Sequence, residues 1–520
     1  MEKLFNNLSK PAAVYVAVLA AVSLYFIAVA RQAVDFPFQD DYDAVLGTIL
    51  YMKASDTSVE KIKIVLAQHN EHRIAFFRIV AFLLFKLQER VDFRVLIWVG
   101  NLGLVALCAA VMLGARKTVP CLHFLAIVPL LIFSPLQGSQ MIWAMASNGN
   151  YWVLAFAAWS LLLLTRDGKK AFCGACLLAV VATFTSGQGI FCFLAGMAAL
   201  FLQRRWRKIL VWSGVFVLTG FIYFKGYYRP QELPMEFSLR SFVFLPILTG
   251  GAESRSLLDW LRPIASMLGI GNGRYPVVFQ AMLGLGVLGL IGYVWLKRYY
   301  RRNLYVSVLL LYLMMLCAAA TLARTSLGFE AADASRYYII SLLIALGLVL
   351  ALMDMRCAKP QGDSVKVLVL MGTAFLNLML WDIHFQEVSG LTSKIIQSRQ
   401  LFMESQDPQA VLYPIKERAT DQLWQSYLMG LLPRKDIDFS RPVLLTPARL
   451  GRISTVESAE QAKDLDPKVE GAARIVANLE WRGNDLELHP AEEPNQVSKT
   501  SGWIAVRNGK LLSFLPAHLQ

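Results

Sequence analysis

The chain consists largely of long apolar segments separated by short polar turns. A helix needs about 20 apolar residues to cross the roughly 30 Å hydrocarbon core of a bilayer. Segments that meet or approach this length lie at about 11–30, 95–115, 150–165, 208–224, 277–296, 304–323, 337–353 and 366–381. Shorter runs that we also expect to span, packed inside a bundle, lie at about 121–135, 171–185 and 189–203. The pattern predicts an all-α polytopic membrane protein with about eleven transmembrane helices.

The run 74–88 is ambiguous because Arg78 and Lys86 interrupt its apolar residues. Cytoplasmic loops of membrane proteins carry an excess of lysine and arginine. If 74–88 lies flat on the membrane, every cluster of basic residues falls on the same side. If 74–88 spans the membrane instead, every basic cluster after it moves to the outside. We therefore expect an interfacial amphipathic helix at 74–88, a cytoplasmic N-terminus, and outside segments at 31–93 and from about residue 382 onward.

Composition and charge support this class. The chain is 56% hydrophobic and only 17% charged, whereas soluble domains average about 45–50% apolar and about 25% charged. The net charge of +14 belongs to the apolar part, because the residues from Asp382 to Gln520 include 16 basic and 18 acidic side chains. Such a basic excess sets topology and meets membrane lipid phosphates, so no nucleic-acid partner is expected. A disordered chain and an ordinary soluble enzyme are excluded.

The polar end of the chain changes character. Residues 409–430 have the pattern of an amphipathic helix, and short alternating runs follow at 474–481, 503–507 and 510–514. Asn508-Gly509 is a hairpin signal between the last two runs. We therefore expect two domains: a transmembrane module over 1–381 and a small extracytoplasmic α+β domain over 382–520.

The first outside loop contains the most unusual polar residues. It begins with Phe38-Gln39-Asp40-Asp41-Tyr42 and ends with Gln68-His69-Asn70-Glu71-His72-Arg73. A carboxylate here could accept a proton from an acceptor hydroxyl or hold a metal ion. Alternatively, Asp40 could cap a helix that begins near Tyr42, and the acids could simply be solvated. Because both polar runs share one loop, we favour a functional role.

A second unusual stretch joins two strong spans on the outside face. Arg324 and Arg336 stand at its ends, against the positive-inside trend. A guanidinium group binds phosphate through two parallel hydrogen bonds, so a phosphate ligand would explain both arginines. Ion pairs with Glu330 or Asp333 are the alternative.

Other polar residues belong to turns on the same face. Asn148 lies in one such turn and Gln188 in another. Amides can hydrogen-bond a sugar, and the indoles of Trp143 and Trp152 can stack on its apolar faces. The two tryptophans fit an interfacial aromatic belt equally well.

These features resemble the GT-C membrane glycosyltransferases, which use polyprenyl-phosphate sugars as donors. The matching residues are Phe38-Gln39-Asp40-Asp41-Tyr42 after the first span, the run 68–73, and Arg324 with Ser335-Arg336-Tyr337. The resemblance is to bacterial envelope members and covers about residues 1–381. It implies that Asp41 or Asp40 deprotonates the acceptor hydroxyl, which attacks the anomeric carbon with inversion.

The resemblance also implies binding roles. Arginines or a divalent metal ion would hold the polyprenyl phosphate, and the donor-phosphate candidates are Arg324, Arg336 and Tyr337. The candidates for binding the acceptor or the sugar are His69, Glu71, His72, Arg73, Asn148 and Gln188. A metal requirement is left open, with Asp41, His69 and His72 as the possible ligands. The acceptor would be a glycan, a lipid or a protein such as a pilin, on the outer face of the bacterial cytoplasmic (inner) membrane.

Two other functions compete with this one. An O-antigen polymerase or ligase also uses lipid-linked glycans, but we would expect its key arginines and histidines in a large late loop. A transporter or flippase of lipid-linked sugars would favour broken helices and ionisable groups deep in the spans. Because the polar residues gather on one face and in the first loop, glycosyl transfer is the favoured function.

Overall fold

A computed structural model describes residues 11–116, 122–228, 238–252, 255, 275–356, 363–405, 408–433, 443–445, 475–482, 485–490, 503–507 and 510–515. The chain folds into two compact units. The first consists of Met1–Val34, Leu66–Phe77 and Arg94–Thr392, and the second of Asp35–Val65, Arg78–Phe93 and Ser393–Gln520. The loop 31–93 is therefore divided between both units.

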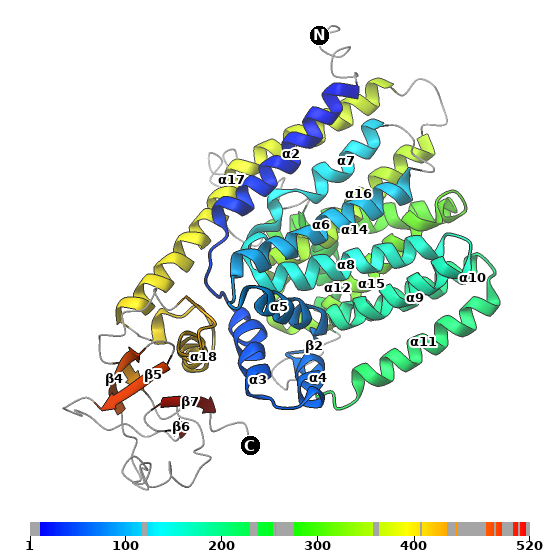
Figure 1. The fold of residues 1–520 in the computed structure, drawn as a ribbon. Coiled ribbons are helices and arrows are strands. Elements are labelled where there is room, and N and C mark those ends of the chain that lie inside the picture. Colours follow the sequence, from blue (N-terminus) through cyan, green and yellow to red (C-terminus); the bar gives the residue numbers. More distant parts are fainter. Residues whose placement is uncertain are drawn as a thin grey trace. The chain divides into compact units, whose positions relative to one another are not determined.

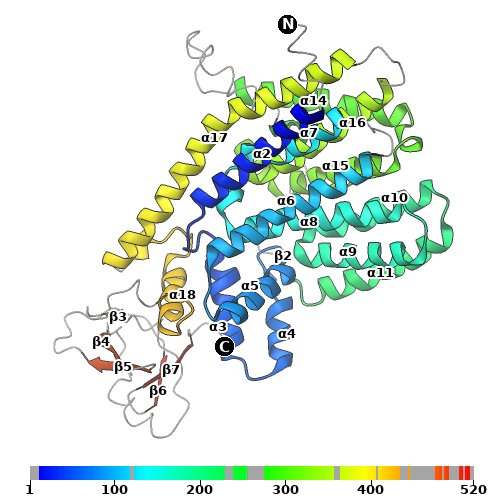
Figure 2. The same ribbon diagram turned by 45° about the horizontal axis from the view of Figure 1, so that its top comes forward.

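Long apolar helices form the first unit (Figures 1 and 2). In chain order they are α2 (Pro11–Gln32), α6 (Phe93–Ala115), α7 (Leu122–Ile132), α8 (Ala144–Leu164), α9 (Lys169–Thr185), α10 (Phe191–Leu202), α11 (Trp206–Phe224), α12 (Leu239–Thr249), α14 (Tyr275–Leu296), α15 (Leu304–Arg324), α16 (Tyr338–Arg356) and α17 (Asp363–Ser405). The helix α17 continues into the second unit. Each of the eleven segments that the apolar pattern marks is helical.

Six helices in the described residues are long and apolar enough to cross a membrane, which indicates a membrane protein. They are Val14–Gln32, Phe93–Ala115, Trp206–Phe224, Val277–Leu296, Leu304–Leu327 and Ser335–Met355. Leu125–Ile132 and Pro135–Ile142 form a seventh candidate that bends by 53° at a break. The expected count of about eleven spans stays a prediction, because α9 and α10 have only 17 and 12 residues.

The helices α6 and α8 are joined by a row of buried and partly buried polar bonds. The amide of Asn148 donates to the Leu96 carbonyl at 2.8 Å. The indoles of Trp152 and Trp159 donate to the carbonyls of Val99 and Ala106 at 2.9 and 2.8 Å. Because each donor occupies a second lone pair of a helical carbonyl, the row ties the helices together without breaking either one. Trp152 thus serves helix packing.

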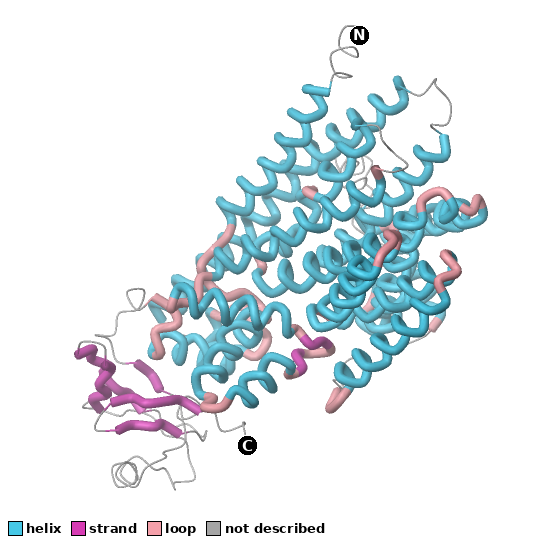
Figure 3. Tube along the Cα trace, turned by 45° about the vertical axis from the view of Figure 1, so that its right-hand side comes forward, coloured by secondary structure: helices cyan, strands magenta, loops and turns pink. Residues whose placement is uncertain are grey.

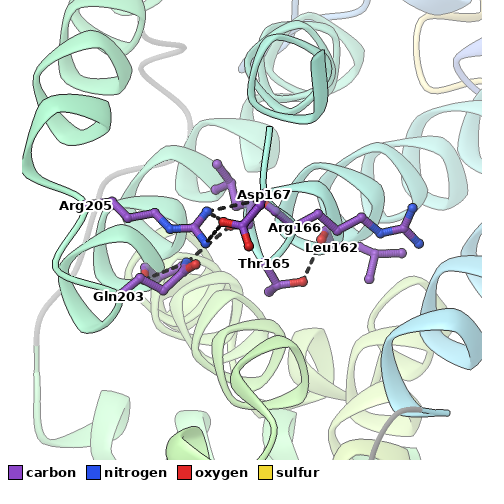
Figure 4. A network of polar contacts seen from close by, with 8 residues as sticks. Leu162, Thr165, Arg166, Asp167, Gln203 and Arg205 are labelled. Atoms are coloured by element: carbon purple, nitrogen blue, oxygen red, sulfur yellow. Dashed lines mark hydrogen bonds and ion pairs between the residues drawn. The ribbon is translucent and has the colours of Figure 1, made fainter. Parts of the chain in front are cut away.

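The turns at one end of this unit share a basic network (Figure 4). Arg205, between α10 and α11, pairs with Asp167 at 2.6 Å and donates to the Arg166 carbonyl at 3.0 Å. Gln203 donates to the Leu164 carbonyl at 3.2 Å. The α8–α9 turn and the α10–α11 turn therefore meet, and the side chains of Gln203 and Arg205 satisfy carbonyls at and just after the end of α8.

The opposite ends of the same helices carry polar turns. Since α8, α9, α10 and α11 follow one another through short turns, the α9–α10 turn and the end of α11 lie away from the basic network. A helix of 21 residues such as α8 separates the two ends by about 30 Å. One end of the bundle is thus basic, and the predicted outside residues gather at the other.

The second unit contains short helices and a sheet. Its helical elements are η1 (Tyr42–Gly47), α3 (Thr48–Ala54), α4 (Ser58–Leu66), α5 (Ala75–Gln88), η9 (Pro408–Ala410) and α18 (Lys416–Leu428), with the first residues of α5 belonging to the first unit. The 14-residue α5 is too short to be among the spanning candidates, and its place in the membrane interface stays a prediction. Arg78 of α5 donates to the Ile64 carbonyl at 2.9 Å, which explains one of its two interrupting charges.

Two strands of the second unit were not predicted and three lie close to the predicted runs 474–481, 503–507 and 510–514, which makes five strands in one sheet (Figure 3). They are β3 (Val443–Leu445), β4 (Ile475–Arg482), β5 (Asp485–Pro490), β6 (Trp503–Arg507) and β7 (Lys510–Leu515), in the antiparallel order β3-β4-β5-β7-β6. Arg507 stands opposite Lys510. The predicted Asn508-Gly509 turn lies outside the described residues. The predicted helix 409–430 is shorter, because α18 begins only at Lys416.

Candidate functional site

A two-stranded hairpin carries the histidine-rich run in the first unit. Its strands are β1 (Gln68–His69) and β2 (His72–Arg73), with His69 opposite His72. Asn70 adopts a left-handed φ of 49°, which asparagine tolerates better than most residues. The side chain of Gln68 donates to the Tyr228 carbonyl at 2.6 Å and accepts from its amide at 3.1 Å. These bonds fix the hairpin to the chain that leaves α11.

Arg73 anchors the hairpin to the end of α11. Its guanidinium donates to the carbonyls of Tyr223 and Lys225, both at 2.6 Å, and also to that of Leu66. The side chain is buried and lies over the Tyr223 ring. Because three carbonyls occupy its guanidinium, Arg73 is a positioning residue here, and these contacts give no support to the expectation that it binds a sugar.

Glu71 forms an ion pair with Arg324 at the end of α15. The carboxylate and guanidinium lie 2.9 Å apart, and their side chains are 23% and 17% exposed. Burial alone would raise the pKa of Glu71, but Arg324 and His72 outweigh it and the pKa is lowered. Tyr337 also lies close enough to Arg324 to interact with it electrostatically. The sequence suggested Glu330 or Asp333 as partners. Glu330 is exposed and forms no described ion pair with Arg324, and the side chain of Asp333 lies outside the described residues.

His72 lies beside this ion pair, and its ring nitrogen Nδ1 is buried without a hydrogen-bond partner. Burial lowers the pKa of His72, with Arg324 and Arg336 acting in the same direction and Glu71 opposing them. The imidazole is therefore neutral at pH 7. A Cβ on Gly187 would come within 3.0 Å of Nδ1, so the glycine lets the η3 turn (Gly187–Ile190) approach the histidine.

Arg336 belongs to η7 (Ser335–Tyr337) at the start of α16. It is exposed, and its guanidinium lies 5.2 Å from the centre of the buried Tyr337 ring. The preceding Ser335 accepts a bond from Gln140 of η2 (Pro135–Ile142) at 3.0 Å, and Gln140 accepts one from Asn150 at 2.7 Å. This chain of bonds holds the backbone beside Arg336 in place while the charge stays accessible.

The remaining predicted residues of this unit differ in accessibility. Gln188 is half-buried in the η3 turn beside His72, and His69 is buried on β1. Asn148 is fully buried in the α6–α8 contact described above, where a sugar has no access. Its position does not support the prediction that it binds a sugar. The structure therefore brings Glu71, His72, Arg324, Arg336 and Tyr337 together, and we call these five residues the arginine cluster.

The acidic pair lies in a tight turn of the second unit. The amide of Phe38 donates to the Asp41 carboxylate at 3.3 Å, and the amide of Asp41 donates back to the Phe38 carbonyl at 3.1 Å. Gln39 has a left-handed φ of 51°. Asp41 is only 1% exposed, whereas Asp40 is half-buried. The side chain of Asp41 makes no capping bond to η1, although Asp41 occupies the position before it.

Asp43, three residues after Asp40, is a structural centre that the sequence did not reveal. Its carboxylate accepts from the Tyr413 hydroxyl and the Gln422 amide, both at 2.6 Å, and pairs with Arg418 at 2.8 Å. The partners lie some 370 residues further along the chain, so no local pattern could have identified them. Burial raises the pKa of Tyr413, and the Asp43 contact raises it further, which keeps the hydroxyl a donor.

The described residues contain no group of three or more histidine, cysteine, aspartate or glutamate side chains placed to hold a metal ion. Asp41, His69 and His72 therefore form no such group. The metal hypothesis gains no support from this arrangement.

Comparisons with known proteins give one distant likeness. No family model and no curated protein matches the chain. The crystal structure of ArnT from Cupriavidus metallidurans in the apo state is similar over 66% of this chain and 77% of that chain, with 12% identity and a TM-score of 0.32. A likeness this distant carries no argument about activity, which must be sought in the residues of this chain.

Proposed function

We propose that the chain is a membrane glycosyltransferase of the GT-C type. It moves a sugar from a polyprenyl-phosphate donor to a glycan, lipid or protein acceptor on the outer face of a bacterial cytoplasmic membrane. The observation that carries the proposal is the arginine cluster at the polar end of an apolar helix bundle. A lipid phosphate is the anion that membrane helices meet at this depth, and arginine is the side chain best suited to bind it.

The arginine cluster acts on the leaving group. As the glycosidic bond breaks, the bond electrons pass to the phosphate oxygen, whose negative charge grows. Arg336 is exposed and stacked on Tyr337, so its guanidinium is available to this oxygen. Preorganised donors of this kind stabilise mainly the transition state. Neutral His72 can donate one ring hydrogen without adding a third positive charge beside Arg324 and Arg336.

The acidic turn acts on the acceptor. A carboxylate of Asp40 or Asp41 accepts the proton of the acceptor hydroxyl while the oxygen attacks the anomeric carbon with inversion. Asp40 has the better access, and the Asp41 carboxylate accepts a bond from the Phe38 amide. A general base of this kind contributes about 10²–10⁴ in rate. The products are the glycosylated acceptor and polyprenyl phosphate.

Substitution of Arg336 tests the proposal directly. We expect Arg336→Lys to lower turnover more than it weakens binding of a short-chain polyprenyl phosphate, because lysine keeps the charge but loses the guanidinium fork. Arg336→Ala should impair both. The control is Arg301→Ala, because Arg301 is an exposed arginine near the start of α15, at the other end of that helix from Arg324.

The assay measures binding of polyprenyl phosphate, with neutral polyprenol for comparison, and sugar release from a panel of polyprenyl-phosphate monosaccharides. If Arg336→Ala binds and turns over like the parent, the arginine cluster does not hold the donor. If the parent moves lipid-linked sugar across vesicle membranes without cleaving it, the chain is a transporter and the proposal is wrong.

A further inference from the structure

The segment 408–432 contains buried side chains that face the acidic turn within the second unit. Besides the three bonds to Asp43, the amide of Gln39 donates to the Leu412 carbonyl at 3.1 Å. The ring of Tyr413 packs on that of Tyr42, with centroids 5.7 Å apart. The turn that carries Asp40 and Asp41 is thus held on both sides, through Gln39 before the pair and through Asp43 after it.

The burial of this segment exceeds what a surface helix shows. Asp421, Gln422, Gln425 and Ser426 of α18 are each less than 9% exposed, although polar side chains usually face solvent. A Cβ on Gly47 would lie 2.7 Å from the Gln422 amide nitrogen, so η1 and α18 approach closely. The Gln422 amide donates to Asp43 across this contact, so a shift between η1 and α18 would break a partly buried polar bond.

We infer that the segment 408–432 completes the acidic site, with Tyr413, Arg418 and Gln422 acting as positioning residues through Asp43. This inference rests on the proposed function for its catalytic consequence. Nothing in the sequence of this segment carries a catalytic signature, and its contribution is to fix the carboxylates of Asp40 and Asp41. A misplacement of about 1 Å can cost about 10²-fold in rate.

Three variants and one control test the inference in the full-length protein. Tyr413→Phe removes one donor to Asp43, and Arg418→Met removes the ion pair while keeping an apolar stem. Asp43→Asn removes the negative charge that Tyr413 and Arg418 both contact. The control is Glu417→Gln, because Glu417 is the exposed neighbour of Arg418 on the same helix.

We expect Arg418→Met and Asp43→Asn each to lower kcat by roughly 10- to 100-fold, with the KM for the donor unchanged, because they displace the base and leave the arginine cluster intact. The double variant should be about as slow as the slower single variant, since both changes break the same contact. Tyr413→Phe should have the smaller effect. Additive losses, or a raised KM with kcat preserved, would overturn the inference.

A second readout does not depend on the reaction. Amide hydrogen exchange of the peptide 38–47 should accelerate in Arg418→Met and Asp43→Asn, and stay at the parent rate in Glu417→Gln. Unchanged exchange would show that the segment 408–432 does not hold the turn. Faster exchange in a protein that transfers no sugar from any donor would leave the mechanical coupling standing and refute the proposed function alone.

Discussion

The ion pair between Glu71 and Arg324 sets up a competition that can be measured. If Arg324 binds the donor phosphate, the incoming phosphate must replace the Glu71 carboxylate. Glu71→Gln removes the competing charge while keeping the shape of the side chain and one oxygen that can accept a bond. We therefore expect this variant to bind polyprenyl phosphate more tightly than the parent, although it removes an interaction from the free protein.

The size of the effect follows from the partial burial of the pair. Exposed ion pairs contribute about 0–1 kcal/mol, and breaking a fully buried pair costs about 3–5 kcal/mol. With side chains 17% and 23% exposed, the pair lies between these limits. A value of about 1–2 kcal/mol corresponds to a Kd for polyprenyl phosphate that is roughly 5- to 30-fold lower.

Two linked measurements check the prediction. Thermal unfolding of the purified protein in detergent should show a lower Tm for Glu71→Gln without ligand, and a larger rise on addition of polyprenyl phosphate. Glu330→Gln is the matched control, because Glu330 is an exposed acid on the same turn as Arg324. Weaker ligand binding in Glu71→Gln, with Glu330→Gln unchanged, would refute the competition and make Glu71 a positioning residue for Arg324.

Two further predictions concern the base and the histidine. The transfer rate and the Tm of Asp40→Asn and Asp41→Asn are to be compared. The variant that removes the base should lower the rate by about 10²–10⁴ at an unchanged Tm. A fully active double variant would show that the acidic pair is only structural. Burial and the two arginines lower the pKa of His72. The stability that the neutral His72 imidazole contributes is therefore fully present above the ordinary histidine pKa of about 6.5, and it is lost as the pH falls toward the lowered pKa. The Tm of the parent should therefore fall below about pH 6.5 more steeply than that of His72→Asn, and parallel curves would contradict this assignment.

Most helices of the first unit, and the strands β4, β6 and β7, were predictable from local pattern. Apolar runs of membrane length leave few alternatives to helix, and the runs at 503–507 and 510–514 gave β6 and β7 almost to the residue. The α18 helix begins later than its amphipathic pattern, since residues 411–415 lie in the bends that carry Tyr413 to Asp43.

The candidate sites were predictable in composition but not in pairing. Arg324 and Arg336 stand out because arginines are uncommon on the outside face. The run 68–73 stands out separately because its charges interrupt the apolar pattern around it. Glu71 and Arg324 form an ion pair although they lie more than 250 residues apart in the chain, so no local pattern could have joined them. Arg73 looked equally functional in the sequence, and only its three carbonyl bonds identify it as an anchor.

The central claim is that this chain transfers a sugar from a polyprenyl-phosphate donor. The most direct measurement incubates the purified parent with a panel of polyprenyl-phosphate monosaccharides and an envelope extract as acceptor, and follows the release of polyprenyl phosphate together with labelled product. We expect one donor to be consumed by the parent, and not by a variant that combines Asp40→Asn, Asp41→Asn and Arg336→Ala. Equal consumption by parent and variant, or glycosylated product without release of polyprenyl phosphate, would contradict the account.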